Sequence, residues 1–478
     1  MIAALTSPLA WPFVVLALSV LFIIVAISKL KLHPFLALMM AGLCAGLLSA
    51  IVPDSTLLPD GTRAVNSVID VTKLLMTGFG TTAGNVAMSI GLASIIACCL
   101  MLSGAADRVV SRFLQAFGDE RAGLALLVST YILSIPIFFD TMFMLMVPLA
   151  IALHKRTGKD FLLYILCICS GGVIPHCLTV PHPGPIAMVD TLKIDAGFSI
   201  LVSMLVGIIP SGAGYFVAKW MNARVTIPLR VSLENPTESA THQAPSFFAS
   251  LLPILIPIGL IGISSMWKIF GGMPAVGETS VLRNLVDFIG DKNIALLIGA
   301  ILSMWLLKQS KGMRLAELGE TLAKPLETAG LVILITSAGG AFGSMIKNAG
   351  VGSAVKHVSE GAGISMILLA YVISLVMRVA QGSSTVAMIT ASAIMYPLLG
   401  ADLPYHPIYI YLSIGFASFA LGWMNDSGFW VVSRLSGMTE KETLKYFSMM
   451  LSMLSLLGLA VTWIGSVVLP MVGKSVFF

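Results

Sequence analysis

Charged residues are scarce in this 478-residue chain: they make up 11% of it, whereas apolar residues make up 57%. Soluble domains carry roughly a quarter charged residues, so this composition excludes an ordinary soluble protein. The apolar stretches are also evenly spread, from Pro12 to Met471. We therefore expect the lipid bilayer to be the solvent along the whole chain.

Other absences narrow the class further. The chain lacks hydrolase motifs such as His-Glu-x-x-His and Gly-x-Ser-x-Gly, which argues against a membrane enzyme. Its histidines and cysteines fit no zinc-binding spacing, so we expect neither a metal nor another cofactor. The net charge of +5 says little about nucleic acid, because the basic residues lie in short loops rather than in one patch, and we expect no nucleic-acid partner.

The cysteines all lie within apolar stretches, at positions 44, 98, 99, 167, 169 and 177. We interpret them as small buried hydrophobic side chains. The alternative is a Cys-x-Cys metal or redox site at Cys167 and Cys169.

Fourteen apolar segments are long enough to cross or dip into the bilayer, seven on each side of a polar stretch. The first, Trp11 to Ser28, has no basic residue before it and no clear cleavage site after it, so we interpret it as a retained helix. We predict two transmembrane halves, 1–221 and 248–478, joined by a cytoplasmic linker, 222–247. The segments are 11–29, 34–53, 85–103, 122–139, 140–153, 160–180 and 198–218, then 248–266, 292–308, 328–347, 363–378, 384–399, 407–422 and 446–469.

The two halves contain similar phrases at nearly constant spacing, which indicates a duplication. The matched pairs are Gly104 and Gly350 (350 − 104 = 246), Pro148 and Pro397 (397 − 148 = 249), and Tyr164 and Tyr411 (411 − 164 = 247). An odd number of passes per half would make the second half enter from the opposite side, as in many secondary transporters. With the N-terminus outside, 19 of the 28 basic residues fall in predicted inner loops, Arg378 among them, which fits the positive-inside rule.

Two polar interruptions predict re-entrant hairpins. They are Pro136 to Thr141 in the first half and Arg378 to Thr385 in the second. The flanking segments have about 14 to 18 residues, fewer than the roughly 20 that a full span needs. We therefore predict an all-α polytopic membrane protein of about 10 full spans and 2 hairpins, with the hairpins entering from opposite sides.

Two further interruptions predict broken helices. Pro175 to Pro185 includes three prolines and a glycine in its last five residues, which we expect to be non-helical. Its counterpart is Trp423 to Gly428. Paired breaks at matching positions of two halves point to a transport site, because unwound backbone at membrane depth is tolerated where it lines a cavity. The alternative is that these stretches are surface loops.

Ionisable residues within the apolar segments are candidates for function, because a charge in the bilayer is costly. Asp140 is expected to carry a coupling proton, or to cap a helix. Asp426 is interpreted as a binding residue, a cap, or both. Arg378 has three readings: contact with an anionic substrate, pairing with an acid, or snorkelling to the interface. His176 and His182 are expected to hydrogen-bond the substrate or to relay protons.

The sequence resembles the gluconate:proton symporter family, the gluconate permeases and their relatives. The likeness covers essentially the whole chain. It rests on His33–Leu38, on His176 with Pro181–Pro185, on Gly382–Met388 and on Asn425–Trp430.

This resemblance implies proton-coupled symport of gluconate or a similar sugar acid across the bacterial inner membrane. It also implies an elevator-type mechanism and a homodimer. The family's hairpin tips and breaks fall here on Asp140, His182, Gly382 to Thr385 and Asn425 to Ser427. Relatives commonly carry Glu where this chain has Asp140, which shortens the reach of the acid by one methylene.

We predict that a small carboxylate binds between the two hairpins. The expected substrate-binding residues are His182, Arg378, Gly382, Ser383, Ser384, Thr385, Asn425, Asp426 and Ser427, and the expected proton-coupling residues are Asp140 and His176. Alternatives are another substrate, such as D-serine or a dicarboxylate, and sodium coupling. A channel and, more distantly, a membrane enzyme are the rival classes.

Overall fold

The computed structural model describes residues 10–51, 68–230, 245–270, 281–351, 365–399, 403–423 and 426–471. This part of the chain is helical and contains no strand. Seven of its helices are long and apolar enough to cross a membrane, and several shorter apolar helices accompany them. The predicted all-α membrane class is confirmed.

The first half contains nine helices in the described part of the chain, and α4 is the longest of them. Its helices are α2 (Trp11–Ser28), α3 (Pro34–Ile51), α4 (Val68–Leu102), α5 (Ala105–Phe117), α6 (Ala122–Leu133), α7 (Phe139–Thr157), α8 (Phe161–Leu178), α9 (Pro183–Leu192) and α10 (Ala196–Asn222). A short 3-10 turn, Asp119–Arg121, precedes α6.

The second half follows the same order. Its elements are α11 (Phe247–Phe270), α12 (Val281–Ile289), α13 (Lys292–Lys311), α14 (Leu315–Asn348), α16 (Met366–Gln381), α17 (Ser384–Met395), a 3-10 turn (Tyr396–Leu398), α18 (Ile408–Ala417), α19 (Ser427–Ser436), α20 (Glu440–Thr443), a π-helical turn (Leu444–Ser448) and α21 (Met449–Val468). In this order α14 corresponds to α4, the pair α16–α17 to α6–α7, and the pair α18–α19 to α8–α9.

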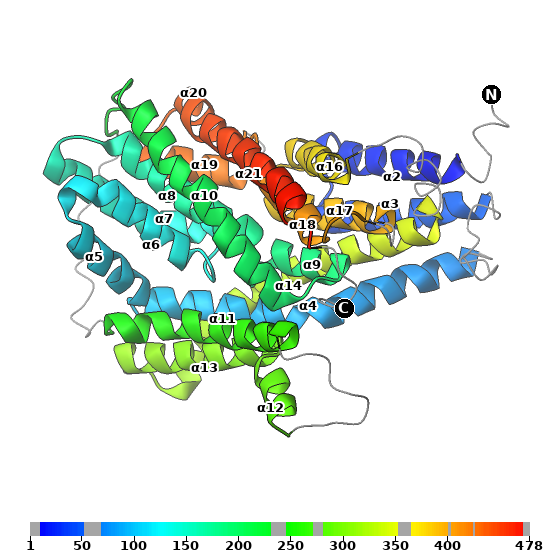
Figure 1. Ribbon diagram of the computed structural model, residues 1–478, viewed down its shortest axis with the longest axis horizontal. Coiled ribbons are helices and arrows are strands. Elements are labelled where there is room, and N and C mark those ends of the chain that lie inside the picture. Colours follow the sequence, from blue (N-terminus) through cyan, green and yellow to red (C-terminus); the bar gives the residue numbers. More distant parts are fainter. Residues whose placement is uncertain are drawn as a thin grey trace.

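The two longest helices form the centre of the molecule. Figure 1 shows α4 and α14 running along much of its length, and they pack against each other. Small residues permit this close approach, because a Cβ added at Gly340 would lie 1.9 Å from Thr82 Oγ1. Both helices are longer than predicted, since their first turns carry polar residues such as Asp70 and Glu317 that interrupt the apolar signal.

The predicted hairpins are present as α6–α7 and α16–α17. Residues 134–138 separate α6 from α7, and only Gly382 and Ser383 separate α16 from α17. The structure places Arg378 inside α16, near this second tip, so its assignment to an inner loop was wrong.

The third predicted break is shorter than expected. Helix α8 continues through Pro175 and His176 to Leu178, and α9 already begins at Pro183. The expectation that the stretch up to Pro185 is non-helical was therefore wrong. Proline is tolerated in a first helical turn, because the N–H groups there have no helical partner to lose.

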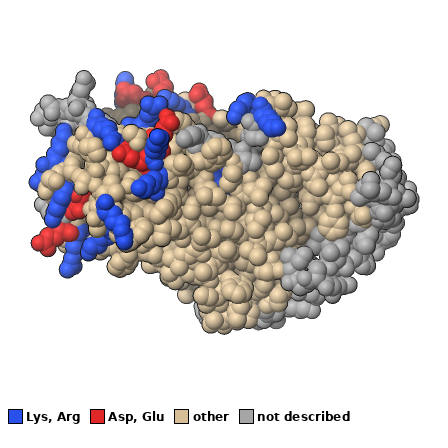
Figure 2. Space-filling view, turned by 90° about the horizontal axis from the view of Figure 1, so that it is seen from above, with Lys and Arg blue, Asp and Glu red and all other residues tan. Residues whose placement is uncertain are grey.

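The distribution of charge fits a membrane protein. In the view of Figure 2, Lys, Arg, Asp and Glu side chains gather mainly at one end, and a broad uncharged surface covers the middle. Large apolar side chains are exposed on the helices, for example Leu205 and Phe216 on α10 and Trp463 on α21. Such exposure is stable where lipid replaces water.

Candidate functional site

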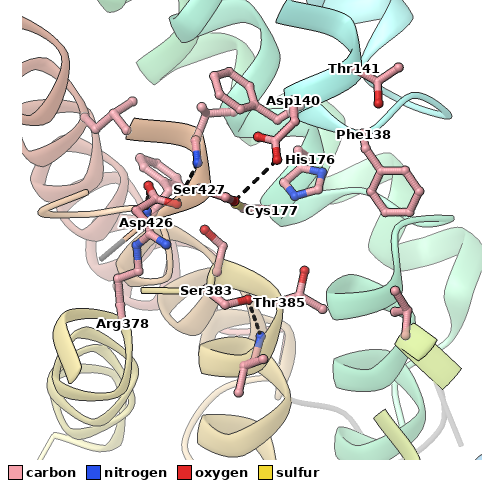
Figure 3. A pocket seen from close by; sticks show the side chains of 18 of the residues that line it. Phe138, Asp140, Thr141, His176, Cys177, Arg378, Ser383, Thr385, Asp426 and Ser427 are labelled. Carbon is pink, nitrogen blue, oxygen red and sulfur yellow. Dashed lines mark hydrogen bonds and ion pairs between the residues drawn. The ribbon is translucent and has the colours of Figure 1, made fainter. Parts of the chain in front are cut away.

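The two hairpin tips and the break before α19 meet around a cavity of about 370 Å³. This volume lies within the range of about 300–1,000 Å³ that is typical of small-molecule sites. Of the residues predicted from the sequence, those that line the cavity are Asp140, His176, Arg378, Ser383, Ser384, Thr385, Asp426 and Ser427. Figure 3 shows several of them converging on one space from separate helices.

Three helices begin at this cavity, and their first turns contribute to its lining. They are α7 with Asp140, α17 with Ser384 and Thr385, and α19 with Ser427. The first N–H groups of a helix lack helical acceptors and carry a positive partial charge. Convergence of three such ends favours an anionic group in the cavity.

Arg378 and Asp426 form a buried ion pair at the cavity wall. Nη2 of Arg378 donates to Oδ2 of Asp426, and both side chains are buried. Nη1 of Arg378 donates to the carbonyl oxygen of Gly382 at 2.5 Å. Oδ1 of Asp426 accepts from the N–H of Gly428 at 3.0 Å and so caps α19. The pair therefore ties the tip of the second hairpin to the start of α19.

One polar atom of this arrangement has no partner. Within the described part of the chain, Nε of Arg378 is buried and makes no hydrogen bond. A buried unpaired donor on a cation is costly, which favours a ligand that supplies an acceptor.

Asp140 lies opposite this ion pair, in the first turn of α7. Its Oδ2 accepts a hydrogen bond of 3.3 Å from the hydroxyl of Ser427. Because Arg378 and Asp426 cancel each other's charge, Asp140 decides the net charge of the cavity. The site carries one negative charge when Asp140 is ionised and none when it is protonated.

The two predicted histidines form a buried pair behind the first hairpin tip. Their ring centres are 4.5 Å apart. His176 lines the cavity, and its Nδ1 has no hydrogen-bond partner in the described part of the chain. His182 does not line the cavity. Its Nε2 lies 2.5 Å from the carbonyl oxygen of Ser134 and therefore carries the proton that is donated.

Some lining residues were not anticipated from the sequence, among them Phe447, which supplies an apolar wall, and Thr328 of α14. Phe138 and Phe139 also supply apolar walls, and they belong to the predicted first hairpin tip. Thr328 stands at helical spacing before two apolar lining residues of α14, but a single threonine in an apolar helix carries no distinctive signal. The predicted residue Asn425 lies outside the described residues.

Gly382 is expected to be required at the tip of the second hairpin. Its φ of +77° is left-handed, a conformation that costs residues with a Cβ roughly 1–2 kcal/mol. We expect Gly382→Ala to lower the melting temperature and also to weaken ligand binding, because the carbonyl of Gly382 positions Arg378. Gly104→Ala is the matched control, because Gly104 has a similar φ of +75° and does not line the cavity. Equal ligand affinity in the two variants would contradict this role.

The fold and the cavity define an integral membrane protein with a partly polar cavity inside its helical bundle. The chain belongs to the GntP permeases: the family model described as "GntP family permease" matches residues 11–468. The family predicted from the sequence is therefore confirmed, and the protein is a multi-pass permease of the bacterial inner membrane.

Individual relatives span nearly the whole chain. A gluconate permease of Pseudomonas aeruginosa is 29% identical over 453 residues, which cover 94% of this chain and 96% of that protein. The D-serine transporter DsdX of Escherichia coli is 27% identical over 462 residues, or 96% and 99% of the two chains. The solved structure of the Alcanivorax borkumensis YdaH transporter matches 92% of this chain and 100% of its own, with a TM-score of 0.63. At 14% identity it shows a shared fold.

Proposed function

We propose that this permease is a proton-coupled symporter of gluconate or a closely related sugar acid. The observation that carries the proposal is the composition of the cavity. It combines three helix N-termini, one cation with an unpaired donor, several hydroxyl groups and a single acid without a cationic partner. The relatives named for gluconate support the choice of substrate.

The substrate carboxylate is assigned to the space between Arg378 and the start of α17. There it accepts from Nε of Arg378 and from the N–H groups of the first turn of α17. The hydroxyls of Ser384, Thr385 and Ser427 then pair with the hydroxyl groups of the acid. A polyol chain fits this surface because each of its hydroxyls both donates and accepts.

Proton coupling follows from the charge balance. An anion that enters the cavity meets the carboxylate of Asp140, and the two repel each other strongly in a medium of low dielectric constant. Protonation of Asp140 removes this repulsion, so the proton and the anion bind more tightly together than separately. Thermodynamic linkage of this kind is reciprocal. His176, beside the cavity, is assigned to proton exchange with Asp140.

We propose an elevator-type movement of the two hairpins with α8–α9 and α18–α19 against the central pair α4 and α14. The two repeats, 1–221 and 248–478, are joined by the linker 222–247, which we place in the cytoplasm. Residues 231–244 of this linker lie outside the described residues. A homodimer is also proposed, as the resemblance to this family implies.

Purified protein in proteoliposomes tests this function. We expect labelled gluconate to accumulate when an inward proton gradient is imposed and to equilibrate without accumulation when an inward sodium gradient replaces it. Melting-temperature shifts with gluconate, D-serine and a dicarboxylate then rank the ligands, because a ligand that binds the native state stabilises it. Accumulation driven by sodium alone would refute proton coupling, and stabilisation only by D-serine or the dicarboxylate would refute the substrate.

A further inference from the structure

The two hairpins do not pack on the central helices in the same way. Ile389 and Ala393 of α17 approach α14 so closely that a Cβ added at Gly339 would lie 1.9 Å from Ile389, and one at Gly343 would lie 2.7 Å from Ala393. In the described part of the chain α7 has no comparable packing on α4. Met144 follows the N-cap of α7 at the same interval as Ile389 follows that of α17, yet Met144 is 56% exposed and Ile389 2%. The hairpin α16–α17 therefore packs on α14, whereas the hairpin α6–α7 does not pack on α4 in the same way.

Helix α14 also supplies one wall of the cavity. The three residues that face it are Thr328, Val332 and Ile335, which we call the α14 wall. Their spacing of four and three residues places them on one face of the helix. Because this wall comes from a central helix, it lies outside the parts that we propose to move.

Helix α4 carries a matching face. When the first residues of α4 and α14 are aligned (315 − 68 = 247), the positions that correspond to the α14 wall are Thr81, Asn85 and Met88. We call these three residues the α4 face. Thr81 is exposed, Met88 is 44% exposed, and a Cβ added at Gly84 between them would meet nothing within 4 Å. Thr81 and Met88 are thus open in the described part of the chain, whereas Asn85 between them is partly buried.

A hydrogen bond shows what the α4 face points towards. Nδ2 of Asn85 donates to Oδ1 of Asp190 at 2.8 Å. Asp190 lies on α9, which starts at the break beside the cavity and belongs to the proposed moving part. The α4 face is therefore directed at the part of the molecule that holds the site, and its polar residues suit that neighbour better than lipid.

We propose that the α4 face is the second wall of the substrate site, used when the site opens on the opposite side of the membrane. This inference rests on the proposed transport function. In the state described, the site lies against the α14 wall and Asn85 is held by Asp190. When the site moves, the Asn85–Asp190 bond breaks, and the Thr81 hydroxyl and the Asn85 amide face the carried acid, as Thr328 does before the movement.

Bulky substitutions distinguish the role of the α4 face from that of the α14 wall. Thr81→Trp and Met88→Trp fill the α4 face, whereas Thr328→Trp fills the α14 wall. Overfilling a packed contact is destabilising, so we expect Thr81→Trp and Met88→Trp to slow gluconate exchange about 5- to 150-fold. Gluconate binding, read from the melting temperature, is expected to stay at the wild-type level in both, because the state described does not use the α4 face. Thr328→Trp is expected to lose binding.

Met76→Trp is the matched control on α4. Met76 is 52% exposed, and it lies about 140° around the helix from Thr81, so exchange is expected to continue at the wild-type rate. Gluconate exchange at the wild-type rate in Thr81→Trp and Met88→Trp would refute the role of the α4 face as a second wall, and the proposed transport function would still hold. Loss of gluconate binding in these two variants would also overturn it. A wild-type protein that neither binds nor exchanges gluconate would instead refute the proposed function.

Discussion

Arg378→Gln is expected to abolish both ligand binding and transport. Truncating one partner of a buried, hydrogen-bonded charge pair costs roughly 2–5 kcal/mol in binding, which corresponds to a loss of affinity of about 30-fold or more. The variant also leaves Asp426 as a buried carboxylate without its cation, and such a loss destabilises a fold by about 3–5 kcal/mol. The measurements are the melting temperature and its shift with gluconate.

A second variant separates the two effects. Arg378→Gln combined with Asp426→Asn removes both charges and keeps side chains that can hydrogen-bond each other. We expect this pair to regain much of the lost melting temperature, since no isolated charge stays buried, but not to regain gluconate binding. Recovery of binding would show that the cation is structural and that the carboxylate of the substrate is held elsewhere.

Asp140→Asn is expected to uncouple transport. The amide resembles the protonated acid in shape and charge, so gluconate still binds and exchanges across the membrane. Without a titratable group, however, a proton gradient can no longer drive uptake, and the ratio of internal to external gluconate is expected to fall to about 1, the value at equilibrium. Uptake into proteoliposomes with and without an imposed pH gradient measures this ratio.

Two other variants serve as controls for this prediction. Asp140→Glu keeps the acid and is expected to accumulate gluconate. Ser427→Ala removes the hydrogen-bond donor to Asp140 and leaves the acid in place, so it is expected to change affinity and not coupling. Full accumulation of gluconate by Asp140→Asn would show that another residue carries the coupling proton, and His176 would be tested next.

Much of the fold could be predicted because lipid imposes strong rules on a sequence. Apolar length located the spans, and polar interruptions located the hairpins near Asp140 and Gly382. Helix ends were harder to place. Pro183 stands in the first turn of α9 because proline is accepted there. The first turns of α4 and α14 are polar, so the apolar signal missed roughly a third to a half of each helix.

The sequence predicted which residues belong to the candidate site, but it did not predict which of them contact each other. Polar residues in an apolar chain pointed to Arg378 and Asp426, yet the sequence left open whether Arg378 pairs with an acid or with the substrate. The structure shows the pair with Asp426 and also an unpaired Nε. Thr328 escaped notice because its role depends on the packing of α14 beside the hairpins, and local sequence does not report such packing.

We propose that one proton enters the cavity with each sugar acid. Simultaneous measurement of gluconate uptake and of the external pH in lightly buffered proteoliposomes tests this stoichiometry. Among the described residues, Asp140 is the single acid lining the cavity without a cationic partner. The external medium should therefore become alkaline by about one proton equivalent per gluconate taken up, and this change should vanish in Asp140→Asn. Gluconate entry into wild-type vesicles with no change in external pH would refute proton coupling.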